Sequence, residues 1–321
     1  MTTPAPPHTF RPAYHPAGHD TELRTTLREL REGRWTAMRS LLDATAAARD
    51  PARWTRRTEV LGAAVAGTDL VGAWRSAEPR SAPAAVMHGR VAVERALRAH
   101  RAGHRHAHAL GHQARQACQV AAGAAPADPV PWVCLLRLAG LGGGRGSAPP
   151  GAMLPPGPWE LLAEADRRDR YNREAYHRML QYLCSRGSSG WAADAADFAL
   201  WSVAGAPGGS PLHALPLHVR AERARRQPSL GPHWGTEVAA REAAAALDGW
   251  FDRAAQPPEN LSDLSVLAHA LYTAGQFRGA ARVFAALGPY YTPWPWGEGA
   301  AATESFLRAR QRCLTVPREP V

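Results

Sequence analysis

The spacing of apolar and polar residues along the chain is that of amphipathic helices. Leu23, Leu27 and Leu30 recur at intervals of three and four residues. Asp20 precedes them and suits a helix N-cap, and Asp50-Pro51 places a cap and a first-turn proline at a later helix start. Further helices are expected at about 84–100, 117–122, 175–183, 191–203, 212–226, 236–255, 264–284 and 300–313. Because no segment alternates with a period of two, the pattern predicts an all-α fold.

One segment, residues 264–284, predicts two helices joined by a tight turn. Gly275 lies at the turn, where glycine adopts backbone conformations that are costly for other residues. Ala268 and Ala280 are small enough to let the two helices approach closely. A single helical hairpin cannot bury its own apolar face, so neighbouring hairpins are expected to stack against it. The spacing of Gly33, Trp35, Met38 and Leu42 repeats that of Gly275, Phe277, Ala280 and Phe284, which favours an irregular α-solenoid.

Proline-rich and glycine-rich segments indicate how the chain is divided. Residues 1–19 carry five prolines and no apolar stretch, which predicts a flexible N-terminal arm rather than a signal peptide or a membrane anchor. Residues 20–315 form the expected helical-repeat domain. Within it, a segment at about 140–158 holds seven glycines and five prolines and predicts a loop. Its glycines do not fit Gly-x-Gly-x-x-Gly and follow no strand, so no phosphate-binding loop is expected there.

Charge and residue usage narrow the classes of function. The formal net charge is +10, and arginine supplies all 38 basic residues because lysine is absent. Without lysine, the chain cannot build a Walker-type phosphate loop, a Schiff-base site or a kinase-type ATP clamp. The arginines are scattered and often lie near Glu or Asp, which favours solvated helix faces over the alternative of a nucleic-acid-binding protein. The four cysteines form no Cys-x-x-Cys pair, which is typical of a reduced cytoplasmic protein.

Five histidines gather between residues 100 and 112. His100, His104, His108 and His112 are four residues apart, so neighbouring pairs would share a face of a helix. Two imidazoles one turn apart are a workable half-site for zinc, nickel or copper. Two glycines weaken a helix here and no acidic residue lies nearby, so we favour an exposed connector rich in arginine and histidine. A metal-dependent protein or an enzyme that uses this cluster is the alternative.

A second notable cluster, near the C-terminus, is aromatic. Trp294-Pro295-Trp296 follows Tyr290 and Tyr291 in a proline-rich turn. Amphipathic aromatic side chains serve both packing and ligand contact, and we favour a cap on the helical array over a ligand site. Neither a Gly-x-Ser-x-Gly elbow nor a His-Glu-x-x-His helix occurs, so no catalytic residue is predicted.

Two stretches resemble known families. Residues 264–284 resemble a tetratricopeptide repeat, whose known role is to present a concave surface to partner proteins. Residues 74–222 resemble a family of uncharacterised helical bacterial proteins related to such repeats. The motifs that carry this likeness are Trp74-Arg75-Ser76-Ala77-Glu78-Pro79, Asp128-Pro129-Val130-Pro131-Trp132, Asp169-Arg170-Tyr171-Asn172 with His177, Met179 and Leu180, and Gly208-Gly209-Ser210-Pro211-Leu212. The chain departs from that family at 185–190, where a tryptophan is expected beside the glycine. The resemblance implies an all-helical fold and brings no cofactor or catalytic residue with it.

The repeat-like hairpin offers the candidate partner-binding residues. In a tetratricopeptide-like hairpin, Ser265, His269 and Tyr272 form a stripe on the first helix that faces the inner side of the array. This stripe suits contact with a peptide, and packing of Tyr272 on the adjacent helix is the alternative. The sequence thus predicts a cytoplasmic, non-enzymatic scaffold that binds a protein or peptide, without a cofactor and without a membrane partner.

Overall fold

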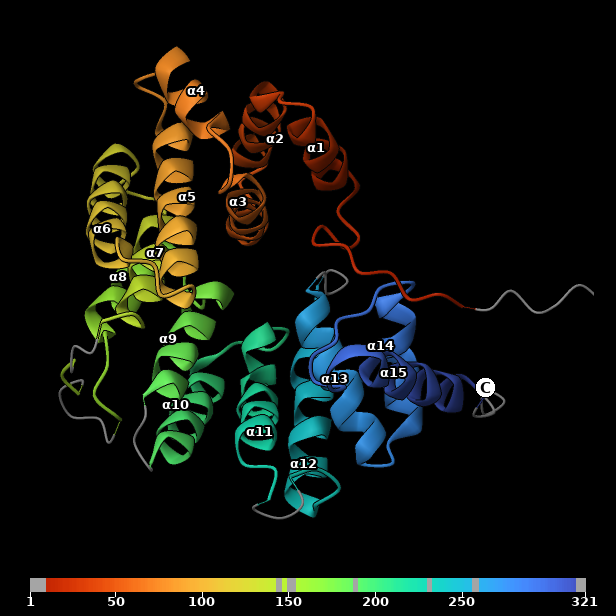
Figure 1. Cartoon of the computed structure of the whole chain (residues 1–321). Coiled ribbons are helices and arrows are strands. Elements are labelled where there is room, and N and C mark those ends of the chain that lie inside the picture. The colour runs from red at the N-terminus through yellow and green to blue at the C-terminus, as the bar shows by residue number, and fades with distance from the viewer. Residues whose placement is uncertain are drawn as a thin grey trace, which may run out of the picture. The chain divides into compact units, whose positions relative to one another are not determined.

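The chain is built from helices, as a computed structural model shows (Figure 1). The structure describes residues 10–142, 146–148, 154–186, 190–229, 233–255 and 260–315. Within these ranges no strand occurs, and Ala13 and Tyr290 form an isolated bridge. The predicted all-α fold is therefore confirmed. The chain divides into two compact units, which we call the N-terminal unit (residues 20–204) and the C-terminal unit (residues 205–321 together with 1–19).

Ten helices begin among the described residues of the N-terminal unit. They are α1 (Thr21–Arg31), α2 (Trp35–Ala47), α3 (Pro51–Val65), α4 (Leu70–Ala77), α5 (Ala82–Arg101), α6 (Ala107–Ala124), α7 (Val130–Ala139), α8 (Trp159–Arg168), α9 (Arg173–Ser185) and α10 (Trp191–Gly205). The helices described in the C-terminal unit are a 3-10 turn, η1 (Pro211–Ala214), α11 (Leu215–Arg226), α12 (Glu237–Ala246), a π turn, η2 (Leu247–Phe251), α13 (Leu261–Thr273), α14 (Phe277–Leu287) and α15 (Gly299–Leu314).

Local capping chemistry sets the first helix starts of the N-terminal unit. The Asp20 carboxylate accepts a hydrogen bond of 2.9 Å from the backbone N–H of Leu23, in the first turn of α1. Asp50 accepts one of 2.9 Å from the N–H of Arg53, and Pro51 occupies the first position of α3. Each carboxylate satisfies a backbone donor that has no partner within its helix. Both predicted caps are confirmed.

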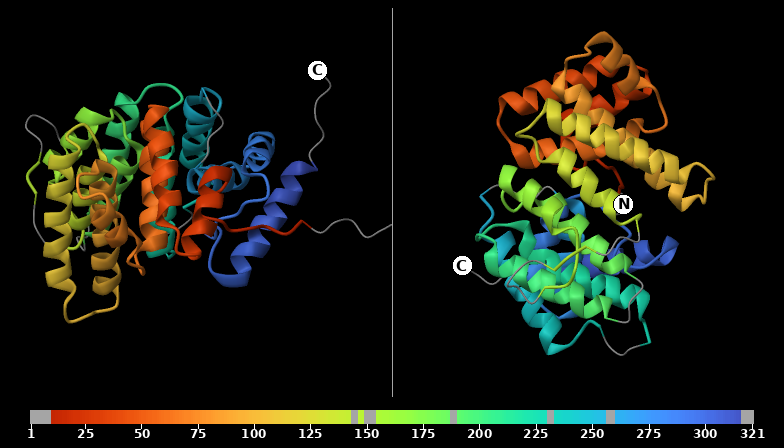
Figure 2. Two further views of the ribbon diagram at one scale, coloured as in Figure 1. Left: turned by 90° about the horizontal axis from the view of Figure 1, so that it is seen from above. Right: turned by 90° about the vertical axis from the view of Figure 1, so that its left-hand side faces the viewer.

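The histidine-rich segment belongs partly to a helix. Gly103 turns the chain after α5 with a φ of +61°, and α6 begins at Ala107 rather than at about residue 117. From there α6 runs beside α5, as both views of Figure 2 show. Ala114 and Cys118 of α6 are wholly buried against this neighbour. That packing outweighs the cost of about 1 kcal/mol that Gly111 imposes on a helix interior.

A buried network of charges fastens three helices of the N-terminal unit. The Glu174 carboxylate on α9 accepts hydrogen bonds of 2.7 and 2.5 Å from the two terminal nitrogens of Arg90 on α5. Arg178 donates to Glu174 at 2.9 Å and to Glu59 of α3 at 2.7 Å. Burial raises the pKa of Glu174, but the charges and hydrogen bonds of both arginines outweigh it and lower that pKa to about 2. The ionised network thereby determines how α3, α5 and α9 pack.

In the C-terminal unit, α13 and α14 form the predicted hairpin. Gly275 makes the turn with a φ of +74°, a conformation that glycine adopts without steric cost. Ala268 and Ala280 are wholly buried, and Leu271 and Phe284 join them in the same core. The predicted turn is therefore confirmed, and both small residues belong to the core of the hairpin as expected. The likeness to a tetratricopeptide repeat stays a prediction.

Residues 10–19 pack within the C-terminal unit. The backbone N–H of Ala13 donates to the carbonyl of Pro289 at 2.9 Å, and the N–H of Tyr291 donates to the carbonyl of Ala13 at 3.0 Å. Ala17 is buried, and Gly18 has a φ of +53° beside Leu261. Residues 1–9 of the predicted arm lie outside the described residues. The division into a flexible arm (1–19) and one helical domain (20–315) stays a prediction.

The predicted loop at about 140–158 lies between the end of α7 and the start of α8. Its described residues, 140–142, 146–148 and 154–158, form neither helix nor strand, and the others lie outside the described residues. Among the helices described, none combines the length and the apolarity that crossing a bilayer requires.

Candidate partner-binding site

The three residues of the predicted stripe lie together on α13 and face other side chains. Ser265 is wholly buried, and its hydroxyl accepts a hydrogen bond of 2.9 Å from the indole N–H of Trp296. The ring centroids of His269 and Tyr272 lie 4.9 and 6.4 Å from that of Trp296. Tyr272 therefore packs on neighbouring structure, as the alternative reading of the sequence supposed. Contact between this stripe and a partner stays a prediction.

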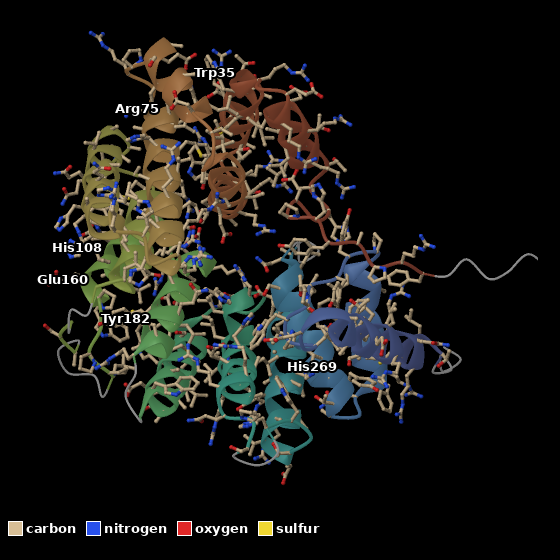
Figure 3. The ribbon with its side chains drawn as sticks, viewed as in Figure 1. Trp35, Arg75, His108, Glu160, Tyr182 and His269 are labelled. Carbon is tan, nitrogen blue, oxygen red and sulfur yellow. The ribbon has the colours of Figure 1, made fainter. Side chains whose placement is uncertain are left out.

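Two tryptophans contact the imidazole of His269, whose place is labelled in Figure 3. The ring centroids of Trp234 and Trp296 lie 4.8 and 4.9 Å away, each with its plane steeply inclined to the imidazole. The Nδ1 atom of His269 is shielded from solvent and has no hydrogen-bond partner among the described residues. Burial lowers the pKa of His269 to about 4. The imidazole is thus uncharged at neutral pH and a weak proton acceptor there.

Trp296 closes the core of the C-terminal unit. Only 7% of its surface is exposed, and its ring centroid lies 5.9 Å from that of Phe284 and 5.4 Å from that of Phe306. Its contacts come from α13, α14 and α15, so one indole joins three helices. We call His269, Tyr272, Trp234, Phe284, Phe306 and Trp296 the closed aromatic cluster. For Trp296, the predicted packing role of the Trp294-Pro295-Trp296 turn agrees with its burial.

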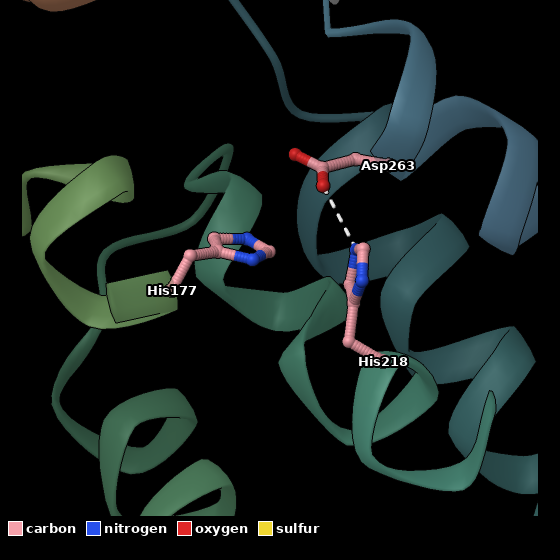
Figure 4. Close-up of side chains that lie close together, drawn as sticks. All are labelled: His177, His218 and Asp263. Carbon is pink, nitrogen blue, oxygen red and sulfur yellow. Dashed lines mark hydrogen bonds and ion pairs between the residues drawn. The ribbon is translucent and has the colours of Figure 1, made fainter. Parts of the chain in front are cut away.

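A histidine–aspartate pair also anchors α13 (Figure 4). The Nε2 atom of His218 on α11 lies 2.9 Å from Oδ1 of Asp263, which is wholly buried. The pair links two helices across 45 residues of sequence. Since no motif connects the two positions, sequence reasoning missed this pair.

The N-terminal unit carries a second aromatic cluster, and this one reaches the surface. Phe198 is wholly buried at its base, with ring centroids of Trp159 and Tyr176 at 5.8 and 6.0 Å. Trp201 contacts all three rings, at 5.5 to 6.3 Å, yet 44% of its surface is exposed. The adjacent Leu200 is 59% exposed. We call Trp159, Tyr176, Phe198, Leu200 and Trp201 the open aromatic cluster.

Polar contacts keep the backing rings of the open aromatic cluster in place. The indole N–H of Trp159 donates to the carbonyl of Pro155 at 2.9 Å. The Tyr176 hydroxyl donates to the Asp166 carboxylate at 3.0 Å. The sequence analysis did not predict this exposed apolar surface, although the sequence of the helix indicates it. In the helix expected at 191–203, Leu200 and Trp201 extend the apolar surface beyond the face that includes Trp191 and Phe198.

The five histidines from residue 100 to residue 112 lie exposed, and four of them form two pairs. His104 and His106 lie in the turn between α5 and α6, with ring centroids 5.5 Å apart. His108 and His112 lie on α6 one turn apart, at 5.0 Å, and His100 lies near the end of α5. The connector expected from the sequence therefore extends only to His106. The pair at 108 and 112 has the helical spacing of a half-site, and metal binding stays a prediction.

Comparison with known proteins gives no match to this chain. No family model, no curated protein and no solved structure matches it. The resemblances to tetratricopeptide repeats and to the bacterial helical family therefore stay predictions.

Proposed function

We propose that this protein is a non-enzymatic scaffold that binds a protein or peptide partner, and that the open aromatic cluster is a contact surface. In this proposal its helices stack as an irregular α-solenoid with a tetratricopeptide-like hairpin at α13 and α14, in the cytoplasm. The observation that carries the proposal is the exposure of Leu200 and Trp201 above a wholly buried Phe198. Large apolar side chains exposed together on a rigid backing are typical of interaction sites, where tryptophan often dominates the binding energy.

Charge beside the cluster indicates the chemistry of the partner. Asp197 lies one turn before Trp201 on α10, is exposed, and has no ion-pair partner among the described residues. A carboxylate at the rim of an apolar contact favours a partner with a basic side chain at that position. The segment that fits best therefore has an apolar residue for Leu200 and Trp201 and a lysine or arginine next to it.

A double variant, Leu200→Ala with Trp201→Ala, tests the proposal against the control Val120→Ala. Val120 is also 59% exposed, on α6, and is not part of the open aromatic cluster. A protein captured in stoichiometric amounts from the cells that express this chain is identified and then titrated. We expect the double variant to bind it at least about tenfold more weakly and the control to bind it normally. Unchanged affinity in the double variant, or no stoichiometric partner, contradicts the proposal.

The stripe on α13 has its own test, His269→Ala with Tyr272→Ala. Because both rings pack against Trp296, we expect this variant to unfold more easily than the wild type. If it keeps its stability and loses the partner, the stripe contacts the partner as the sequence predicted. If stability falls while affinity for the partner is kept, the stripe belongs to the core alone.

A further inference from the structure

A pocket of about 360 Å³ lies between α4 and α5 of the N-terminal unit. One part of its lining is apolar and consists of the buried Val71 and Val91. The other part is basic, with Arg75 on α4 and with His88 and Arg95 on α5. Figure 3 labels Arg75. The volume lies within the range of small-molecule sites, about 300–1,000 Å³.

Neither arginine of the pocket forms an ion pair with a residue that the structure describes. The side chain of Arg75 is half-buried and makes no hydrogen bond or ion pair with any residue that the structure describes. Arg95 donates from Nε to the carbonyl of Ala66 at 2.8 Å and from Nη2 to that of Thr68 at 2.6 Å, both of which are uncharged. Its Nη1 has no partner in the described part of the chain. Asp69, an exposed residue at the rim, supplies the acidic group of the lining.

The pKa of the His88 imidazole reflects the positive charge of the two arginines. Burial lowers its pKa, and the charges of Arg75 and Arg95 lower it further. Both guanidinium groups therefore act on the same part of the pocket. A negative group placed there offsets two positive charges that no buried carboxylate of the lining balances.

We propose that this pocket binds a small organic anion. Its carboxylate or phosphate group lies between Arg75 and Arg95, and its apolar part lies on Val71 and Val91. A guanidinium group with unused N–H donors forms charge-assisted hydrogen bonds to such oxygens, often two at once. The two valines offer an apolar surface to the apolar part of an organic anion. An inorganic ion has no such part, so it gains nothing from this surface.

Calorimetric titration of the full chain with phenyl phosphate and with benzoate tests the proposal. Inorganic phosphate supplies the charged head alone, and benzyl alcohol supplies the apolar part alone. We expect saturable binding of one ligand per chain for at least one aryl anion, weaker binding of inorganic phosphate and none of benzyl alcohol. The tighter of the two aryl anions identifies the head group. If neither aryl anion shows saturable binding, the proposal is overturned.

Three variants locate the site. Arg75→Gln should weaken binding at least about tenfold, because it removes a charge-assisted hydrogen bond and leaves no protein partner unpaired. Asp69→Asn should strengthen binding about threefold or more, since it removes the negative charge of the pocket lining, which repels an anion. Arg80→Gln is the matched control. Arg80 is an exposed residue of the turn that joins α4 to α5, and it does not line the pocket. Equal weakening in Arg75→Gln and Arg80→Gln would reveal unspecific attraction to a basic surface and overturn the proposal.

Titration of His88 by NMR gives a second, independent readout. The His88→Gln variant identifies the resonance. A bound anion should raise the pKa of His88, because its charge offsets those of Arg75 and Arg95. A pKa of His88 that stays constant at saturating anion places the ligand elsewhere and also overturns the proposal.

Discussion

The closed aromatic cluster of the C-terminal unit and the open aromatic cluster of the N-terminal unit use the same kinds of side chain to opposite effect. In the closed cluster, Trp296 is 7% exposed and its indole N–H donates to the buried Ser265. In the open cluster, Trp201 rests on buried rings but is 44% exposed, beside a Leu200 that is 59% exposed. Both tryptophans pack against other aromatic rings, so their roles differ because one is buried and the other is partly exposed to solvent.

The difference extends to the polar residues around each cluster. On α13, Ser265 is wholly buried and His269 is half-buried with its Nδ1 shielded from solvent. Ser265 satisfies an indole that would otherwise lose a hydrogen bond on burial. On α10, Asp197 is exposed beside Trp201 and remains available to a partner. Polar groups therefore complete the core in one unit and border an accessible apolar surface in the other.

The largest effect that we expect separates the two tryptophans by stability. Trp296→Ala should lower the free energy of unfolding of the C-terminal unit by about 3–5 kcal/mol, because it empties a core site and leaves Ser265 without its donor. Trp201→Ala should cost less than about 2 kcal/mol, since much of its surface already meets water. Urea unfolding measures both losses, and hydrogen exchange of α13 amides assigns the first to the C-terminal unit.

Trp250→Ala serves as a positive control for this comparison, since Trp250 belongs to the same core and is 2% exposed. Equal losses of unfolding free energy in Trp201→Ala and Trp296→Ala would contradict the distinction between the open and the closed aromatic cluster. A loss in Trp296→Ala far below that in Trp250→Ala would contradict it as well.

The next effect uses pH to detect how tightly the closed cluster encloses His269. Its pKa of about 4 lies below the ordinary value of 6.5, so between these values the unfolded chain binds a proton that the folded chain excludes. Stability is therefore fully present above about pH 6.5 and falls as the pH drops toward 4. The fall should reach up to about 3 kcal/mol, measured by urea unfolding at a series of pH values.

His269→Gln provides the control, because it removes this titrating group and should make the profile between pH 6.5 and 4 less steep, leaving the contribution of His88, whose pKa is also lowered. The buried Glu174 loses its contribution at lower pH, between its ordinary pKa of 4.5 and about 2, so the range above pH 4.5 is free of it. Identical slopes in the wild type and in His269→Gln would show that solvent reaches the imidazole.

A smaller effect tests the hydrogen bond that completes the closed cluster. Ser265→Ala should cost about 1–3 kcal/mol, because the indole N–H of Trp296 stays buried without an acceptor. Combining it with Trp296→Phe in a double-mutant cycle isolates the pair, since phenylalanine has no N–H to satisfy. Additive losses in the cycle would mean that the two side chains do not interact.

Sequence reasoning succeeded where local chemistry decides the structure. The caps at Asp20 and Asp50 and the turn at Gly275 depend on residues within one helical turn, so their effect is visible in a short stretch of sequence. Small residues at Ala268 and Ala280 likewise indicated positions that the core encloses.

Sequence reasoning failed where a side chain contacts a residue that is distant in the sequence. The acceptor for Trp296 is a serine 31 residues away, and a serine on a helix looks like a surface residue until its donor is known. The pocket depends on how α4 and α5 place Arg75 near His88, which periodicity does not describe. The start of α6 was missed because packing against α5, and not the intrinsic preference of a glycine-containing segment, decides it.

The smallest effect is expected at the outermost residue of the open cluster. Leu200→Ser removes an apolar side chain that is 59% exposed, so little buried surface is lost and the free energy of unfolding should change by no more than about 0.5 kcal/mol. Leu264→Ser, on α13, is the matched control, because Leu264 is wholly buried and the same substitution should cost several kcal/mol. Urea unfolding of both variants compares one chemical change at two exposures. A loss above about 2 kcal/mol for Leu200→Ser would mean that another part of the protein covers Leu200 in solution. The open cluster would then be closed, and its assignment as a partner surface would be wrong.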